Sequence, residues 1–192
     1  VVAVVVEQGG FGGSVAYAAT KGGIVSRTRG LARSHDKDKI TVNAVSGYSG
    51  GGKAMIESYE VTKIAPSFEL YGLGLEHKHV PELQLYSRLT RRPIFVPSVG
   101  NFRQGMLVSV PLHLDTLTRR PKVADLEAAL SAHYKGATLV SVVSAEKAGR
   151  IPAEALNGTD KLELRVFSNE AERQAVLVAR LDNLGKGAAG AA

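Results

Sequence analysis

Three segments in the C-terminal half of the chain carry the apolar patterns of β-strands, and they constrain the fold more than any other feature of the sequence. Apolar residues alternate with others over 105–115 and over 161–167, as in strands that bury one face. The segment 174–181, QAVLVARL, is more continuously apolar, which indicates a strand in the middle of a sheet. Proline cannot donate to a strand ladder, so Pro111 predicts an edge or a bulge in the first segment.

A helical segment lies between the first two of these strands. Apolar residues recur at helical spacing over 122–135, and Lys135 and Gly136 form a C-terminal signal. The apolar positions are Val123, Leu126, Leu130 and Tyr134. Short strands joined by a helix predict a mixed sheet covered by helices on one face, which is a fold of the α/β (α+β) class.

The N-terminal half predicts a helix, a strand, and a glycine loop that leads into a second helix. Residues 14–35 carry apolar positions at helical spacing, and 40–45 is a short β-branched run. The loop SGYSGGG at 46–52 precedes the helical stretch KAMIESYE. Backbone N–H groups at such a junction favour an anion, so Ser46 and Ser49 are candidate substrate-binding residues. A plain turn is the alternative.

The composition predicts a soluble globular protein. The 192 residues contain no apolar run near the roughly 20 residues that cross a bilayer, so we expect no signal peptide, no membrane partner and a cytoplasmic location. The net charge is +6, but Lys and Arg are spread along the chain without a recognised nucleic-acid motif, which favours solvated surface charge over nucleic-acid binding. The absence of cysteine excludes disulfides, thiolate metal sites and a cysteine nucleophile.

A tyrosine and a lysine four residues apart lie on the first predicted helix, in YAATK at 17–21, and TVNAVS follows at 41–46. This segment resembles the short-chain dehydrogenase/reductase family, in which the lysine lowers the phenol pKa so that the tyrosine exchanges a proton with the substrate. The resemblance implies Tyr17 as the acid/base and Lys21 as its partner. No glycine-rich nucleotide turn precedes the helix, and an ordinary amphipathic helix is the alternative.

A second and longer set of motifs runs from Thr41 to Ala192. The segments are TVNAVSGYSGGGKAMI, FELYGLGLEHKHVPEL, RRPIFVPSVGNFRQGMLVSVPLHL, EALNGT and ARLDNLGKGAAGAA. They resemble, in order, the short bacterial type of N-acetyl-gamma-glutamyl-phosphate reductase. The resemblance implies a glyceraldehyde-3-phosphate-dehydrogenase-like C-terminal domain for substrate binding and dimerisation over 41–192, after a short-chain-dehydrogenase-like strand/helix fragment over 1–40. It also implies NADP, a homo-oligomer, and N-acetyl-glutamyl phosphate or its semialdehyde as the small-molecule substrate in arginine biosynthesis.

Chemistry in this family begins, by resemblance, with a cysteine thiolate that attacks the acyl phosphate, and NADPH reduces the resulting thioester to the semialdehyde. That cysteine belongs upstream of Thr41, and the sequence has none. We therefore expect an oxidoreductase domain with negligible turnover by itself. The alternatives are a non-catalytic dimerisation or ligand-binding module and a short-chain dehydrogenase fragment.

The histidine part of the family pattern is present in EHKHVPE at 76–82. By resemblance His79 is the acid/base, and Glu82 orients it and fixes its tautomer. His77 and His79 would point the same way on an extended segment, and Pro81 can open a helix. A surface loop with two solvated histidines is the alternative. We expect no metal site, because no third ligand has a suitable spacing.

The remaining candidates lie further along the chain. Arg103 offers a guanidinium fork for a phosphate or carboxylate, with an ordinary surface arginine as the alternative. By resemblance Asn183, Lys186 and Gly187 approach the nicotinamide, which makes them candidate cofactor-binding residues. Asp160 departs from the family pattern, which has asparagine there, and replaces a neutral donor with a carboxylate.

Overall fold

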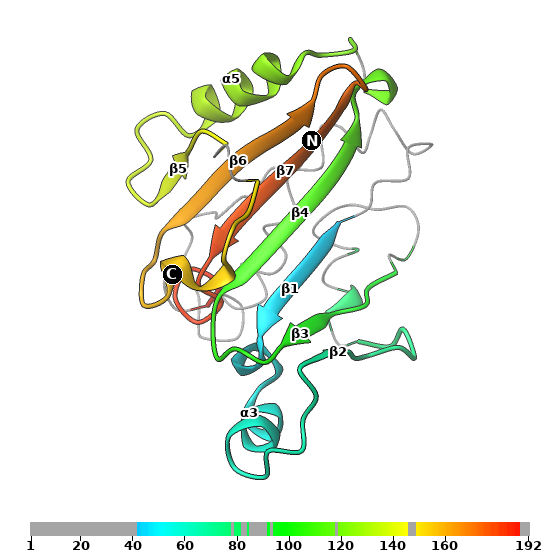
Figure 1. Ribbon diagram of the computed structural model, residues 1–192, viewed down its shortest axis with the longest axis vertical. Helices are drawn as coiled ribbons and strands as arrows, with labels where there is room; N and C mark the ends of the chain where they lie inside the picture. Colours follow the sequence, from blue (N-terminus) through cyan, green and yellow to red (C-terminus); the bar gives the residue numbers. More distant parts are fainter. Residues whose placement is uncertain are drawn as a thin grey trace.

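The computed structural model describes residues 42–77, 79–81, 84, 92, 94–117, 119–145 and 149–188. The described strands form one seven-stranded sheet in the order β2-β3-β1-β4-β7-β6-β5 (Figure 1). In chain order they are β1 (Asn43–Gly47), β2 (Phe68–Leu70), β3 (Ser98–Gly100), β4 (Met106–His113), β5 (Val140–Val142), β6 (Leu162–Asn169) and β7 (Gln174–Leu181). The helices whose bounds both lie in these ranges are α3 (Lys53–Glu60) and α5 (Val123–His133), with short 3₁₀ turns η1 (Tyr48–Gly51), η2 (Leu114–Thr116) and η3 (Ala153–Leu156).

The sheet is mixed, as predicted. β1 runs parallel to β3 and β5 parallel to β6, whereas the other neighbouring strands are antiparallel. β7 pairs with β4 and β6 along its whole length, which confirms that 174–181 is central. β4 pairs with β1 only as far as Ser109, so Pro111 lies where β7 is the remaining described neighbour, as the prediction of an edge position requires.

The hydrophobic core lies on the face of the sheet that α5 covers. Val123, Leu126 and Leu130 of α5 pack against alternate residues of the long central strands. These strand residues are Val108, Val110 and Leu112 of β4, Leu162, Leu164 and Val166 of β6, and Ala175, Leu177, Ala179 and Leu181 of β7. Burying a side chain such as Leu or Val contributes about 1.5–3 kcal/mol. Because successive side chains of a strand point to opposite faces, the alternating apolar residues all lie on the face that α5 covers.

The predicted helix over 122–135 is confirmed as α5. The backbone N–H of Lys122 donates to the Asp125 carboxylate at 2.8 Å, which satisfies a donor at the start of the helix. Gly136 has a φ of +82°, a conformation that glycine adopts readily and that ends the helical path. The helix boundaries thus follow from local sequence signals.

The predicted strand, glycine loop and helix after residue 40 are confirmed as β1, η1 and α3. Gly52 separates η1 from α3 and has a φ of +85°, so a residue with a side chain would be strained there. The chain leaves the sheet at Gly47, makes the 3₁₀ turn, and enters α3 below the end of β1 (Figure 1). The predicted helix over 14–35 lies outside the described residues.

One row of residues across the sheet determines where the polar loops gather. Ser46 of β1 is opposite Met106 of β4, Met106 is opposite Leu181 of β7, and Leu181 is opposite Leu162 of β6. β1 and β7 leave the sheet beside this row, whereas β4 and β6 enter it there (Figure 1). Four loops therefore meet at one end of the sheet. We call them the sheet-end loops: residues 47–52, 101–105, 157–161 and 182–188.

Candidate functional site

The side-chain amide of Asn183 joins three of the sheet-end loops. Its Nδ2 donates to the Ser49 hydroxyl at 3.0 Å, and its Oδ1 accepts from the backbone N–H of Gly105 at 2.8 Å. A backbone N–H only donates, so these partners define which end of the amide is oxygen. Asn183 and Ser49 are both buried. The structure therefore brings together one predicted substrate-binding residue and one predicted cofactor-binding residue.

Asp182, the residue before Asn183, joins the remaining sheet-end loop, 157–161, to the same network. Its Oδ2 accepts from Gln104 Nε2 and from the backbone N–H of Gly158, both at 2.7 Å, and its Oδ1 accepts from the N–H of Leu184 at 2.9 Å. Asp182 is 1% exposed, and a buried carboxylate is stable only when donors replace its lost water. Asp182 and Asn183 together hold all four loops in one arrangement.

The turn at 183–188 is packed too closely for side chains at two glycines. A Cβ on Gly185 would collide with the carbonyl of Thr159, and a Cβ on Gly187 would lie 2.7 Å from the backbone of Asn183. Lys186, between them, is buried. Burial lowers the pKa of its ammonium, and the negative charge of Asp160 opposes part of that shift. The acidic residue at 160 is thus a charge partner for this buried lysine.

Ser46 is at the start of the same network. Its hydroxyl donates to the carbonyl of Gly47 at 3.0 Å, and a Cβ on Gly50 would lie 2.8 Å from the hydroxyl oxygen. A Cβ on Gly47 would lie 2.6 Å from the backbone of Arg103 and Gln104. These two glycines allow the loop 47–52 to pack directly on the 101–105 loop and on the Ser46 side chain.

Arg103 lies on the exposed side of the sheet-end loops. Its Nη1 donates to Glu60 Oε1 at 2.9 Å, and the Tyr48 hydroxyl donates to the same oxygen at 3.2 Å. The Tyr48 ring stacks on Tyr59 with centroids 4.6 Å apart. Desolvation, together with the hydrogen bond to Glu60 and its charge, raises the pKa of the Tyr48 phenol, so this group stays protonated at neutral pH.

The histidine candidates lie in another part of the fold, beside the start of β3. The His77 ring packs edge-on against Phe95 and Tyr71, with centroids 5.0 and 6.0 Å away. The His79 ring is 4.9 Å from the His77 ring, so the two side chains are adjacent. The expected extended backbone is wrong, because the N–H of Val80 donates to the carbonyl of His77 at 2.9 Å and closes a turn. This turn leads directly into a helical backbone at Val80, which favours turn over strand geometry.

The backbone of His79 determines the tautomer of its neighbour. The His79 N–H donates to His77 Nδ1 at 3.2 Å, so a neutral His77 carries its proton on Nε2. His79 itself is 6% exposed. Pro81 and Gln84 have helical backbone, in agreement with the prediction that Pro81 can open a helix. Glu82 lies outside the described residues, and its role in orienting His79 stays a prediction.

The histidines and the Ser49 network lie at opposite ends of one strand pair. Tyr71 donates its N–H to the carbonyl of Pro97 at 3.1 Å, and Pro97 directly precedes β3. β1 is parallel to β3, with Ser46 opposite Val99, and Ser49 follows the end of β1. The sequence candidates therefore form two groups. Tyr17 and Lys21 lie outside the described residues.

Several residues of the sheet-end loops and their partners are absent from the sequence-based candidates, among them Tyr48, Glu60, Gly105 and Asp182. Asp182 could have been predicted from the sequence, because a carboxylate directly after the central apolar run requires buried hydrogen-bond partners. Gly105 contributes through its backbone N–H, and residue identity carries no signal for that. Tyr48 and Glu60 are 12 positions apart and meet only because α3 folds back beneath η1.

Two further observations on the described residues concern metal binding and membrane crossing. In the described ranges, no three His, Asp or Glu side chains gather in a way that could hold a metal ion. No described helix has the length and apolar character needed to cross a membrane.

Comparison with known proteins places the chain in a family. Residues 27–183 match the family described as "Semialdehyde dehydrogenase, dimerisation domain". The N-acetyl-gamma-glutamyl-phosphate reductases of Brucella ovis and Brucella canis are each 53% identical over 160 residues, which is 80% of this chain and 52% of the relative. The chain thus spans about half the length of the curated relatives it matches.

Solved structures with the same fold agree with this match. Aspartate semialdehyde dehydrogenase II from Vibrio cholerae has a TM-score of 0.54 at 16% identity, over 86% of this chain and 56% of that one. Aspartate semialdehyde dehydrogenase from Francisella tularensis has a TM-score of 0.55 at 13% identity, over 92% and 60%. The predicted glyceraldehyde-3-phosphate-dehydrogenase-like C-terminal fold is confirmed. The resemblance to N-acetyl-gamma-glutamyl-phosphate reductases is likewise confirmed, and the chain belongs to the semialdehyde dehydrogenase dimerisation-domain family.

Proposed function

We propose that this chain is the substrate-binding and dimerisation domain of an N-acetyl-gamma-glutamyl-phosphate reductase, a cytoplasmic, NADP-dependent oxidoreductase of arginine biosynthesis. The observation that carries the proposal is the 53% identity to reductases of that name over 80% of the chain. The proposed domain spans 41–192, as the sequence motifs predict, after a separate fragment over 1–40. The sheet-end network supports the proposal, since residues of the matching motifs hold its four loops in one arrangement.

The proposed reaction converts an acyl phosphate to an aldehyde through a thioester on cysteine. This sequence has no cysteine, so the nucleophile comes from another part of the enzyme. The residues of this chain bind and position the substrate. Arg103 and the loop that carries Ser46 and Ser49 hold its anionic groups, and the imidazole of His79 holds or releases a proton at the reacting oxygen.

NADP supplies a hydride when it is bound. The proposed contacts from Asn183, Lys186 and Gly187 do not fit this arrangement without rearrangement, because both ends of the Asn183 amide engage other loops and the other two residues are buried. We therefore derive no step through the cofactor from these residues. In the proposal they support the sheet-end loops, and their contact with the nicotinamide stays a prediction.

The proposal is tested by adding back the missing half. The purified chain is assayed alone and mixed with the part of the Brucella ovis relative that it does not match. The assay is NADP reduction in the presence of N-acetylglutamate semialdehyde and phosphate. We expect turnover only in the mixture, and none when this chain carries His79→Ala, since the acid/base group is then missing.

Two outcomes would contradict the proposal. Turnover by the mixture that His79→Ala leaves unchanged would remove the proposed role of this domain in the chemistry. No turnover from folded, associated partners would favour the second candidate, a non-catalytic dimerisation or ligand-binding module. Circular dichroism and sedimentation establish folding and association before either result is read.

We propose a second copy of the chain as its partner, in keeping with the dimerisation domain named for the family. The sheet face opposite α5 supports this, since Phe167, Val176 and Val178 lie half-buried on it. Sedimentation velocity should give twice the monomer mass of 20.3 kDa. Val178→Glu should produce monomers, whereas Ala129→Glu, on the exposed side of α5, should not. A monomeric wild-type chain would contradict the proposal.

A further inference from the structure

Two hydrogen-bond donors converge on one carboxylate oxygen at the rim of the sheet-end loops. Glu60, the last residue of α3, accepts at Oε1 from the guanidinium of Arg103 at 2.9 Å and from the hydroxyl of Tyr48 at 3.2 Å. A cation and a neutral donor directed at one oxygen form an arrangement that recognises a carboxylate. The site is therefore already filled by a carboxylate of the chain itself.

The Tyr48 side chain and the backbone of Arg103 are held in place independently of Glu60. The N–H of Tyr48 donates to the carbonyl of Phe102 at 2.9 Å, and the N–H of Ser49 donates to the carbonyl of Arg103 at 3.1 Å. These bonds fasten the 101–105 loop to η1. The stacked ring of Tyr59 limits the movement of the Tyr48 phenol. Loss of the Glu60 carboxylate would thus leave the Tyr48 phenol and the backbone that carries Arg103 near their present positions.

The contact with Glu60 is one that a ligand can replace. The Arg103 side chain is 60% exposed and that of Glu60 is 33% exposed, so water screens the ion pair. Exposed pairs of this kind contribute little to stability, and the Arg103 side chain gives up little when it changes partner. Arg103 is also adjacent to the Ser49 loop, which the proposed function assigns to substrate.

We propose that Glu60 is an internal competitor at a carboxylate-binding site formed by Arg103 and Tyr48, and that the carboxylate of a small-molecule ligand takes its place on these two donors. The ligand class, an N-acylated amino-acid carboxylate, rests on the proposed function. The exchange itself rests on the geometry. Glu60 sets the affinity of the site, because every ligand must first displace it.

The experiment measures binding by the chain itself and needs no turnover. N-acetyl-L-glutamate is titrated into ¹⁵N-labelled chain at low salt, and the amide signals of Tyr48 and Ser49 are followed. Glu60→Gln keeps the shape of the side chain but removes its charge. Glu57→Gln is the matched control, an exposed residue one turn earlier on the same helix. We expect the Kd to fall about three- to fivefold in Glu60→Gln, the range set by the strength of an exposed ion pair.

The control separates local competition from a change in net charge. Glu57→Gln should shift the Kd by clearly less, and the difference between the two variants should disappear when Arg103→Gln is added to each. High salt should reduce the difference, because the competing pair is exposed. An equal Kd in the two single variants, or weaker binding in Glu60→Gln, would overturn the proposal.

The ligand chemistry and the proposed function are tested separately. Inorganic phosphate is titrated in the same way, and a gain for phosphate without a gain for N-acetyl-L-glutamate would overturn the carboxylate assignment. A gain for N-acetyl-L-glutamate supports internal competition even if the add-back assay shows no reductase activity. Failure of the binding experiment in a mixture that is active overturns the role of Glu60 and leaves the proposed function intact.

Discussion

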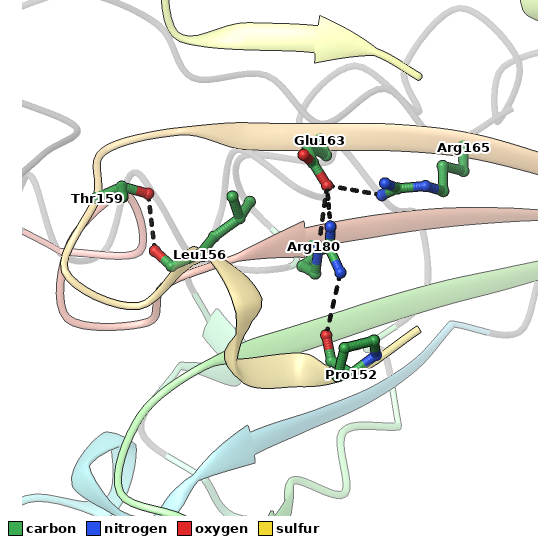
Figure 2. Close-up of polar contacts among 6 residues, drawn as sticks. All are labelled: Pro152, Leu156, Thr159, Glu163, Arg165 and Arg180. Atoms are coloured by element: carbon green, nitrogen blue, oxygen red, sulfur yellow. Dashed lines mark hydrogen bonds and ion pairs between the residues drawn. The ribbon is translucent and has the colours of Figure 1, made fainter. Parts of the chain in front are cut away.

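Two groups of Arg–Glu ion pairs in this domain differ in their solvent exposure. On the sheet, Glu163 of β6 accepts from Arg165 at 2.7 Å and from Nε of Arg180 on β7 at 3.0 Å, and the three side chains are 20%, 4% and 10% exposed. Figure 2 shows both guanidinium groups directed at one carboxylate, with Arg180 also reaching the carbonyl of Pro152. At the rim, Arg103 and Glu60 form a single pair that is 60% and 33% exposed.

The difference shows what burial does to the same chemistry. Burial alone would raise the pKa of Glu163, but hydrogen bonds and charge from Arg165 and Arg180 outweigh it and hold that pKa below its usual value. The carboxylate is thus an obligatory counter-ion for two buried cations, and it fastens β6 to β7. The exposed pair has water as an alternative partner, so it can exchange without disturbing the sheet.

The largest expected effect is the loss of the buried counter-ion. Glu163→Gln leaves two buried guanidinium groups without a negative charge, and we expect the free energy of unfolding to fall by about 3–5 kcal/mol. Urea denaturation followed by circular dichroism measures the change. Glu172→Gln, at an exposed turn position, is the matched control and should stay within about 0.5 kcal/mol of wild type. A loss below about 1 kcal/mol for Glu163→Gln would show that the cluster is no stronger than the rim pair.

Asp182 is a second buried carboxylate, and its hydrogen-bond donors are neutral groups, whereas those of Glu163 are guanidinium cations. Asp182→Asn directs an NH₂ group at donors from Gln104, Gly158 or Leu184, and we expect a loss of about 1–3 kcal/mol. The same denaturation measures it. Asp115→Asn serves as the exposed control, since the Asp115 side chain is 58% exposed. A neutral effect of Asp182→Asn would mean that these three donors do not require a charged acceptor.

Acid should weaken the buried cluster selectively. The folded pKa of Glu163 lies below its usual value of 4.5, so the unfolded chain binds more protons at mildly acid pH. The stabilisation from Glu163 is therefore complete above pH 4.5 and is lost as the pH falls through the folded pKa. Denaturation of wild type and Glu163→Gln at a series of pH values should show the two curves converging in acid. Parallel curves would contradict the shift.

The smallest expected effect concerns the rim pair. Glu60→Gln should change the free energy of unfolding by at most about 1 kcal/mol at low salt, and the change should shrink at 1 M salt. Thermal denaturation at the two salt concentrations measures it. A loss as large as that of Glu163→Gln would show that Glu60 is structural, which would also remove the reason for treating it as exchangeable.

Much of the fold could be predicted from the sequence because its longest elements carry local periodic patterns. β4, β6, β7 and α5 each repeat an apolar pattern over at least eight residues. β2, β3 and β5 have three residues each, which is too short for a period of two to be recognised. Their positions depend on neighbours that pair with them.

The candidate site could be predicted only in part, for a different reason. Motifs identified Ser49, Asn183 and Arg103 one at a time, whereas the partners of each depend on the strand order. Glu60 reaches Arg103 across 43 positions, and a local pattern contains nothing about that approach. An extended segment would point His77 and His79 the same way, but the N–H of Val80 donates to the carbonyl of His77 and the backbone forms a turn instead.

The hydrogen bond between Ser49 and Asn183 spans 134 positions. Closing so long a loop carries an entropic cost that intervening strand pairs must offset first. β7 is the last of the described strands and pairs with both β4 and β6, and its pairing with β4 brings Asn183 to the loop that contains Gly105. The hydrogen bonds that join the sheet-end loops therefore depend on a strand pairing between segments far apart in the sequence, and not on local structure in any one loop.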